Sequence, residues 1–175
     1  MERIDRKIYN SEKLLVINSE IIDWNLEKRH GMQKWRAHDR YGFIELNLYE
    51  LENYKNKINK GFPSDYCSNI DWKVDENIFP KELYHLHLEE IKDYADFIAS
   101  YISALKGKHL NFIFEITFAG FHIIDSFRKN TYGRALIEAV ISCFNQESYN
   151  AGKSYKEKYH SPEKIEYQMS HYKND

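Results

Sequence analysis

Two histidines and a glutamate stand at alternate positions in the segment LYHLHLEE. In a β-strand, His85, His87 and Glu89 would lie on one face, because successive side chains of a strand point to opposite faces. Two imidazoles and a carboxylate form a ligand set that zinc or iron accepts. In a helix the two histidines would instead point about 200° apart. We favour two ordinary surface histidines and expect no bound cofactor.

A second pattern resembles the acidic and E-x-K residues with which some nucleases hold a divalent metal. Glu90 and Lys92 stand two residues apart, downstream of Asp71 and Asp75. Those nucleases place the E-x-K pair on a strand, next to a metal-bound water. Here the pair falls at the start of the segment with the clearest helical periodicity. A metal-dependent hydrolase or nuclease that uses the two histidines and nearby carboxylates is therefore the alternative function, not the principal one.

The two cysteines do not suggest catalysis. Cys143 follows Val140 on the apolar side of an expected helix, which predicts an inert buried thiol. Cys67 lies in an acidic segment, where nearby negative charge raises the pKa of a thiol. The sequence also lacks the glycine-rich loops that bind phosphates and the G-x-S-x-G motif of serine hydrolases. We therefore expect a protein that is not an enzyme.

Length and composition set broad limits on the function. A chain of 175 residues with 42% hydrophobic residues is expected to fold as one domain. The formal net charge of −2 argues against direct binding of nucleic acid, which needs an excess of Lys and Arg. We predict a cytoplasmic protein without a membrane partner, because neither a signal segment nor a run of about 20 apolar residues is present. Ile, Asn, Lys and Tyr, whose codons are AT-rich, are abundant, whereas the chain has only 7 Gly and 3 Pro. This bias fits an AT-rich genome or mobile DNA.

Acidic residues gather in two neighbouring parts of the chain. The segment from Asp65 to Glu76 has one lysine, Lys73. Further on, three carboxylates recur at i, i+4 and i+7 and would share one helix face. The two groups either form one negative patch or are simply solvated. The residues predicted to bind a partner are Asp65, Asp71, Asp75, Glu76, Glu89, Asp93 and Asp96.

Tyrosine is the second feature that suggests recognition. The chain has 14 tyrosines, and several lie in its polar C-terminal part, where no core obviously needs them. Exposed tyrosines offer contact area at low entropic cost. AT-rich coding, which supplies tyrosine often, explains them equally well. The C-terminal tyrosines are Tyr149, Tyr155, Tyr159, Tyr167 and Tyr172.

The stretch Leu110–Phe127 predicts the centre of the fold. From Leu110 to Phe118, apolar residues recur at every second position, as in a strand with one buried face. A second β-like run, Phe121–Phe127, follows Gly120. The two runs predict either a hairpin or one long strand bent at a glycine bulge. We expect a single α+β domain with a mostly antiparallel sheet around this stretch.

Two helices are expected to pack on this sheet. Apolar residues at i, i+3, i+4 and i+7 predict a helix over Glu89–Leu105, with Gly107 as its C-terminal cap, and another over Thr131–Gln146. The preceding LYHLHL run is compatible with strand or helix. From about residue 147 we expect a polar and loose tail, with one short helix after Ser161 and Pro162.

The N-terminal half is predicted to alternate between helices, strands and loops. Ser11–His30 reads mostly as helix, with Gly31 as its stop and a polar connection from Met32 to Arg40. The remaining expectations are a strand over Tyr41–Leu48, a short helix over Leu48–Ile58, and a loop over Ser64–Pro80 with a short strand at Ile70–Val74.

Size, acidic groups, surplus tyrosine and the absence of a catalytic motif lead to one functional interpretation. We expect a bacterial immunity protein, similar to an antitoxin, that neutralises a cognate toxin by covering its active site. An acidic surface suits a basic nuclease domain as the partner. A phage-encoded inhibitor of a host defence enzyme is the third option, since it would act by the same occlusion.

Overall fold

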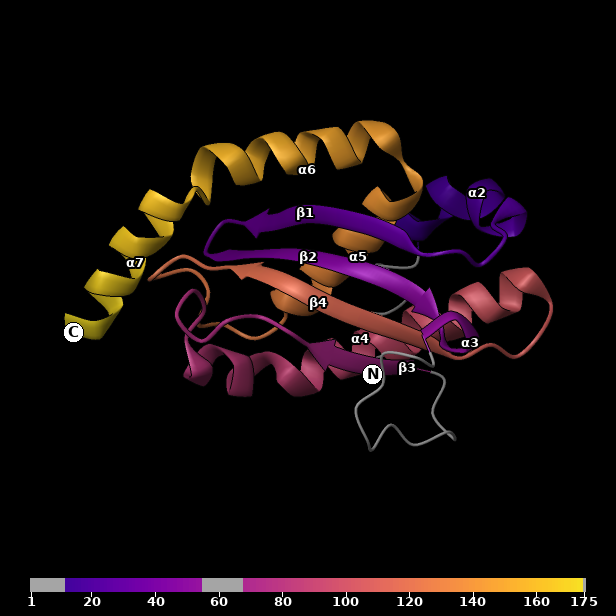
Figure 1. The fold of residues 1–175 in the computed structure, drawn as a ribbon, viewed down its shortest axis with the longest axis horizontal. Coiled ribbons are helices and arrows are strands. Elements are labelled where there is room, and N and C mark those ends of the chain that lie inside the picture. The colour runs from indigo at the N-terminus through magenta and orange to yellow at the C-terminus, as the bar shows by residue number, and fades with distance from the viewer. Residues whose placement is uncertain (1–11, 55–67, 175) are drawn as a thin grey trace.

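Four strands form a mixed sheet in the order β1-β2-β4-β3 (Figure 1). This computed structural model describes residues 12–54 and 68–174. The β1–β2 and β2–β4 pairs are antiparallel, and the β3–β4 pair is parallel. The strands are β1 (Arg29–Ala37), β2 (Arg40–Glu50), β3 (Ser68–Trp72) and β4 (Phe112–Gly120). The chain is therefore a single α+β domain with a mostly antiparallel sheet, which confirms the predicted fold class.

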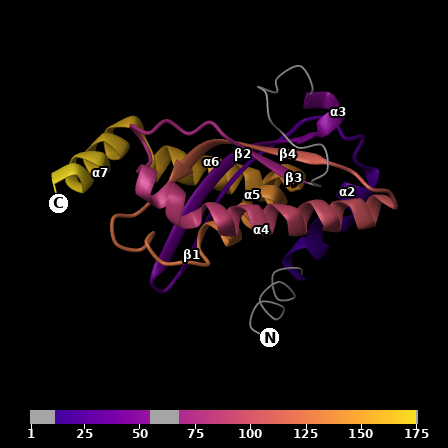
Figure 2. The same ribbon diagram turned by 90° about the horizontal axis from the view of Figure 1, so that it is seen from below.

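Helices cover one face of the sheet and one of its ends (Figures 1 and 2). The long α4 and the shorter α5 lie against what we call the inner face, and α6 runs along β1. No helix in the described ranges is long and apolar enough to cross a membrane. The helices are η1 (Leu15–Ile17), α2 (Asn18–Asp23), α3 (Leu51–Tyr54), α4 (Lys81–Lys106), α5 (Tyr132–Phe144), α6 (Gln146–Tyr159) and α7 (Pro162–Asn174).

Strand β4 lies at the centre of the core. Its inner-face residues Phe112, Phe114 and Ile116 have no exposed surface. They belong to one cluster with buried side chains of β2, α4 and α5. The period-two pattern of the sequence therefore predicts this strand correctly, because β4 is paired on both edges and alternates its side chains between the two faces.

The run Phe121–Phe127 does not form a strand, so the predicted hairpin or bent strand is wrong. Residues 121–131 form a turn-rich loop after β4. Hydrogen bonds hold the backbone of this loop in place. The His122 amide donates to the Ser126 hydroxyl oxygen at 2.8 Å. The Asp125 carbonyl accepts the Tyr41 amide at 3.0 Å. Ile124 is 72% exposed, so the apolar residues of this run are not all core residues.

The N-terminal segment is also not one helix. Helix α2 ends at Asp23 and β1 begins at Arg29, so the predicted stop at Gly31 and the connection over Met32–Arg40 are wrong. This segment pairs with β2 along its whole length. The Met32 amide, which points away from β2, donates to Ser142 Oγ of α5 at 2.8 Å.

Helix α4 begins eight residues earlier than predicted, at Lys81. Leu83, His87 and Ile91 recur every four residues and are all buried, so the LYHLHL run is helical and faces the core with one side. The predicted end is confirmed: Gly107 takes the left-handed conformation with φ of 69° and closes the helix.

The C-terminal part forms two helices where a loose tail was expected. The α carbon of Gly152 in α6 lies so close to β1 that a Cβ there would overlap the carbonyl oxygen of Met32. Helix α7 begins at Pro162, as predicted, and buries Met169 to 6% exposure. The tail therefore belongs to the domain core.

His160 joins these two helices and is itself buried. Its Nε2 pairs with the Tyr41 hydroxyl, and its ring packs on Phe43 at 5.3 Å between centroids. Burial, together with the nearby ammonium groups of Lys156 and Lys164, lowers the pKa of His160 to about 4. The ring is therefore neutral at neutral pH.

Replacing Phe114 by alanine should lower the free energy of unfolding by about 3–5 kcal/mol, because it empties a fully buried site in the central strand. Phe127→Ala, at a position 41% exposed, is the matched control and should cost less than about 1 kcal/mol. Chemical denaturation measures both. Similar midpoints for the two variants would contradict the central role of β4.

The buried imidazole predicts a loss of stability in acid. The unfolded chain binds a proton on His160 near pH 6.5, but the folded chain only near pH 4. Stability is therefore complete above pH 6.5 and should fall by about 2–4 kcal/mol as the pH drops to 4. Unfolding free energies of the wild type and His160→Gln, measured between pH 7 and 4, test this. The variant should show the shallower dependence, and equal slopes would contradict it.

Candidate functional site

A row of carboxylates runs along one face of α4. Positions 82, 89, 93 and 96 lie within about 60° of one another around the helix axis and span about 21 Å. Glu89 and Asp96 are exposed, and Asp93 is partly buried. The Asp96 carboxylate accepts the Ser68 hydroxyl at the start of β3. We call Glu82, Glu89, Asp93 and Asp96 the acidic stripe.

Two further predicted carboxylates are exposed between β3 and α4. Asp75 closes a tight turn, in which its side chain accepts the Asn77 amide at 2.8 Å and its carbonyl accepts the Ile78 amide at 3.0 Å. Asp75 and Glu76 are both exposed at this turn. The chain from Ser68 to Ile98 has eight acidic and three basic residues, so this segment is negative overall.

The structure separates Asp71 from the acidic stripe. Asp71 lies opposite Glu115 in the sheet and faces the outer face, which α4 and α5 do not cover. The Tyr54 hydroxyl lies 2.5 Å from Asp71 and 2.9 Å from Glu115, and Lys73 Nζ lies 3.6 and 2.9 Å from them. Asp71 is thus part of a polar network on the outer face of the sheet. The other predicted residue of this segment, Asp65, lies outside the described residues.

Glu115 at the centre of this network is ionised. Burial favours its neutral acid, but hydrogen bonds from Asn47, Lys73 and Tyr54 hold the pKa of the carboxyl below its usual range. On the neighbouring strand, Glu45 pairs with His30 at 2.6 Å and with Lys156 at 2.5 Å. Both carboxylates are fully compensated by their neighbours, so they fix the outer face and leave little charge for a partner.

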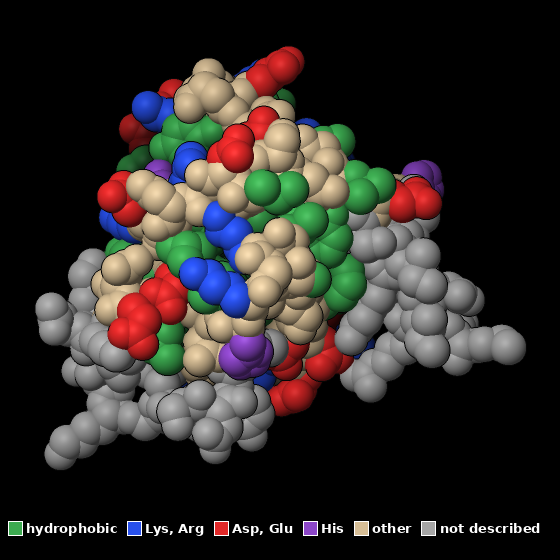
Figure 3. Space-filling view, turned by 90° about the vertical axis from the view of Figure 1, so that its right-hand side faces the viewer, with side chains coloured by type: hydrophobic (Ala, Val, Ile, Leu, Met, Phe, Trp, Pro, Cys, Tyr) green, Lys and Arg blue, Asp and Glu red, His purple; other side chains and the backbone are tan. Residues whose placement is uncertain are grey.

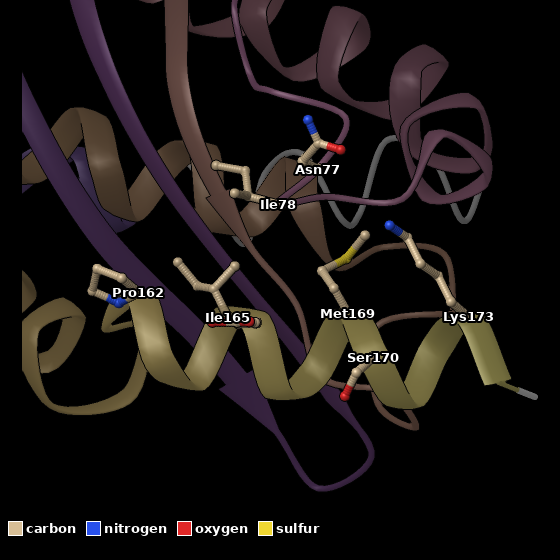
Figure 4. Close-up of a pocket in the computed structure, with 8 residues that line it drawn as sticks. Asn77, Ile78, Pro162, Ile165, Met169, Ser170 and Lys173 are labelled. Atoms are coloured by element: carbon tan, nitrogen blue, oxygen red, sulfur yellow. The ribbon is translucent and has the colours of Figure 1, made fainter.

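An apolar groove lies between α7 and the turn that follows Glu76 (Figure 4). Ile165 and Met169 on α7 point toward Ile78 across a space of about 480 Å³. Lys173 and Glu166 stand at its rim. The groove exists because α7 turns Ile165, Met169 and Tyr172 to one side, at i, i+4 and i+7.

One hydrogen bond joins α7, the helix that lines the groove, to the acidic stripe. The Tyr172 hydroxyl of α7 donates to Glu82 of α4 at 2.7 Å. The Tyr172 ring also stacks on Phe127 at 6.4 Å and an angle of 21°. The groove on α7 and the acidic stripe on α4 are thus linked at one point.

The opposite end of the molecule carries both signs of charge (Figure 3). Lys and Arg side chains gather near the centre of that surface (Figure 3). Lys28, Arg29 and His30, at the start of β1, line a cavity of about 340 Å³ there.

The histidines of the predicted metal site do not face each other. His87 is buried, and its Nε2 lies 2.6 Å from the Ser126 carbonyl, whereas His85 is exposed. Burial lowers the pKa of His87, so its ring is neutral. Glu90 accepts the amides of Thr131 and Gly133 at 3.3 Å. Within residues 12–54 and 68–174, no group of three or more His, Cys, Asp or Glu side chains is placed to hold a metal.

The remaining predicted residues are scattered. Cys143 is a buried free thiol whose pKa burial raises to about 12, while Cys67 lies outside the described residues. Tyr167 is 65% exposed on α7. Tyr155 packs against the ring of Phe43 at 6.1 Å between centroids.

Sequence reasoning missed both the groove and Glu82. Glu82 was overlooked because the helix was expected to begin at Glu89, too late to include the first member of the stripe. The groove was overlooked because α7 was expected to be short and the tail loose. The signal for it was present in the spacing of Ile165, Met169 and Tyr172.

Comparison with known proteins adds no family. No protein-family model matches the chain, and no curated protein matches its sequence. Among solved structures, the protein ttk003000868 from Thermus thermophilus is similar over 70% of this chain, with 14% identity and a TM-score of 0.35. The chain spans only 16% of that protein's length. This likeness is too weak to support an argument about fold or function.

The positions of the two histidines lead to a paired prediction. His87→Ala should lower the free energy of unfolding by about 2–4 kcal/mol, because it leaves a cavity and a buried carbonyl without its donor. His85→Ala should change it by less than about 0.5 kcal/mol. Thermal or denaturant unfolding measures both. Equal effects would place the two side chains in similar surroundings, as in a strand, and would contradict the helix.

Proposed function

We propose that this chain is a cytoplasmic, non-catalytic binding protein that neutralises a basic toxin or nuclease domain by covering its active site, as a bacterial immunity protein does. The observation that supports this best is that α7, which lines the apolar groove, is joined to the acidic stripe on α4 by the hydrogen bond from Tyr172 to Glu82. An apolar centre beside a charged margin is the usual anatomy of a specific protein interface.

The groove supplies a place for an anchor side chain. Binding energy in protein complexes concentrates in a few side chains that enter well-packed pockets and lose their water. Ile78, Ile165 and Met169 line such a depression, with polar residues beside them. An aliphatic or aromatic side chain of the partner fits this chemistry.

The carboxylates supply long-range attraction. Most of the stripe and the Asp75–Glu76 turn are exposed, and charges of one sign along a surface accelerate encounter with an oppositely charged partner. A nuclease domain that binds nucleic acid has a basic active-site surface. Covering that surface would exclude its substrate without any chemistry by the inhibitor.

The same surface would serve an inhibitor of a host defence enzyme, so the two roles differ only in partner. The alternative of a metal-dependent hydrolase has no support from His85 and His87, which lie on different sides of α4. The first candidate for the toxin is the protein encoded by the gene next to the one for this chain.

Binding kinetics against that product test the acidic surface. Glu76→Lys combined with Glu89→Lys should slow association at least tenfold at low salt, and raised salt should slow wild-type association in the same way. Glu27→Lys combined with Glu157→Lys, two exposed carboxylates outside the site, is the matched control and should have a much smaller effect. Tight binding with an association rate that changes neither with salt nor with Glu76→Lys and Glu89→Lys would reject the acidic surface as the docking site.

Ile165→Gln tests the groove. It should raise the dissociation rate at least tenfold and leave the association rate nearly unchanged, because anchor contacts act after encounter. Ile22→Gln, at an exposed isoleucine on α2 at the other end of the molecule, is the control. Circular dichroism verifies that both variants fold. Equal dissociation rates for the two variants would remove the groove from the proposal.

A further inference from the structure

A third cavity lies where the β1–β2 hairpin, the loop after β4 and the junction of α6 with α7 come together. Its volume is about 340 Å³, within the range of small-molecule sites. It is distinct from the groove, since the two share no lining residue. Lys34, Arg36 and Tyr41 line one side, and Tyr155, Tyr159 and His160 line another.

The charge of this cavity is positive. Lys34 and Arg36 project from β1 into its lining, against a single carboxylate, Asp125. In the described part of the chain, no carboxylate lies within ion-pair distance of Lys34 or Arg36. Two uncompensated cations beside each other favour an anionic ligand, since charge-assisted hydrogen bonds are the strong ones.

A neutral donor reinforces this preference. His122 Nδ1 lies 3.2 and 3.3 Å from the amides of Ile124 and Asp125 and accepts from them, so its proton is on Nε2. Burial raises the pKa of Tyr41, which keeps its hydroxyl protonated beside His160. The Tyr41 hydroxyl is already paired with His160, so the lining offers the ring N–H of His122 beside the two cations.

Flat rings form the remaining walls. The Tyr155 and Tyr159 rings lie 4.5 Å apart between centroids, and Lys34 Nζ lies 4.5 Å from the centre of the Tyr155 ring. Phe121 adds an apolar surface from the loop after β4. Aromatic walls beside cations accept a planar ring next to the anionic group.

We propose that this cavity binds a small aromatic oxyanion, of mononucleotide size or less, with its phosphate or carboxylate on Lys34 and Arg36 and its ring against Tyr155 and Tyr159. Phosphate and carboxylate would be recognised by the same two cations, and the experiment below determines which of them binds. The site is independent of the proposed partner, because neither the groove nor the acidic stripe contributes to it.

Calorimetric titration of the full-length protein tests this site directly. Adenosine monophosphate and benzoate serve as the phosphate and carboxylate probes, and adenosine and inorganic phosphate supply the ring and the anion alone. At least one complete probe should bind with a dissociation constant below about 1 mM, at least tenfold more tightly than either part. Which of the two probes binds identifies the anion.

Two double variants decide whether the cavity is responsible. Lys34→Gln with Arg36→Gln should weaken the binding at least tenfold, while Lys108→Gln with Lys153→Gln, two exposed lysines elsewhere, should leave it unchanged. Both pairs remove the same charge, so a general effect of net charge is controlled. The proposal is overturned if no probe binds, if adenosine or phosphate alone binds as tightly, or if the two double variants behave alike.

Discussion

The parallel pairing of β3 with β4 is the constraint on which the arrangement of the domain depends. Parallel neighbours cannot be joined by a tight turn, so the chain must cross the sheet between them. Helix α4 makes this crossing with 26 residues, about 39 Å of helix against about 31 Å for the nine residues of β4. It therefore extends past the strand ends, where its first turn meets α7 through Glu82 and Tyr172.

This crossing also determines which charges are available to a partner. One side of α4 must enter the core, with residues such as Leu83 and Ile91, and the other side must remain in water. The acidic stripe is on the side away from the core. The carboxylates of the sheet itself are instead paired internally: Glu45 and Glu115 form ion pairs with lysines, and Glu115 also accepts a hydrogen bond from Tyr54. The exposed carboxylates of α4 are thus open to solvent, whereas those of the sheet are held in internal ion pairs and hydrogen bonds.

Strong periodic patterns made the centre of the fold predictable. The strand at β4 and the helices α4 and α5 each bury one face against several elements, and such burial leaves a regular spacing of apolar residues. The same reasoning found Glu89, Asp93 and Asp96, because helical spacing alone groups them. Elements with weak apolar patterns were not predictable in this way.

Strand β1 shows why the rest could not be predicted. At Gly31, a Cβ would overlap the carbonyl oxygen of Ala139, so the strand is buried through its backbone and has no apolar side chain there to reveal it. The loop 121–128 shows the reverse, since Ile124 is apolar and exposed. The groove depends on α7 docking beside residues 77 and 78, a contact between distant segments that no local pattern contains.

The two edges of the sheet are protected by different means. At β1, Ser142 and Gly152 meet the amide and carbonyl of Met32 that point away from β2, so helices occupy that edge. At the other edge, β3 has five residues and, among the described strands, pairs only with β4. Short edge strands with charged side chains such as Asp71 are poor templates for a second chain. Resistance to edge-to-edge aggregation therefore depends on helix packing at one side of the sheet and on brevity and charge at the other.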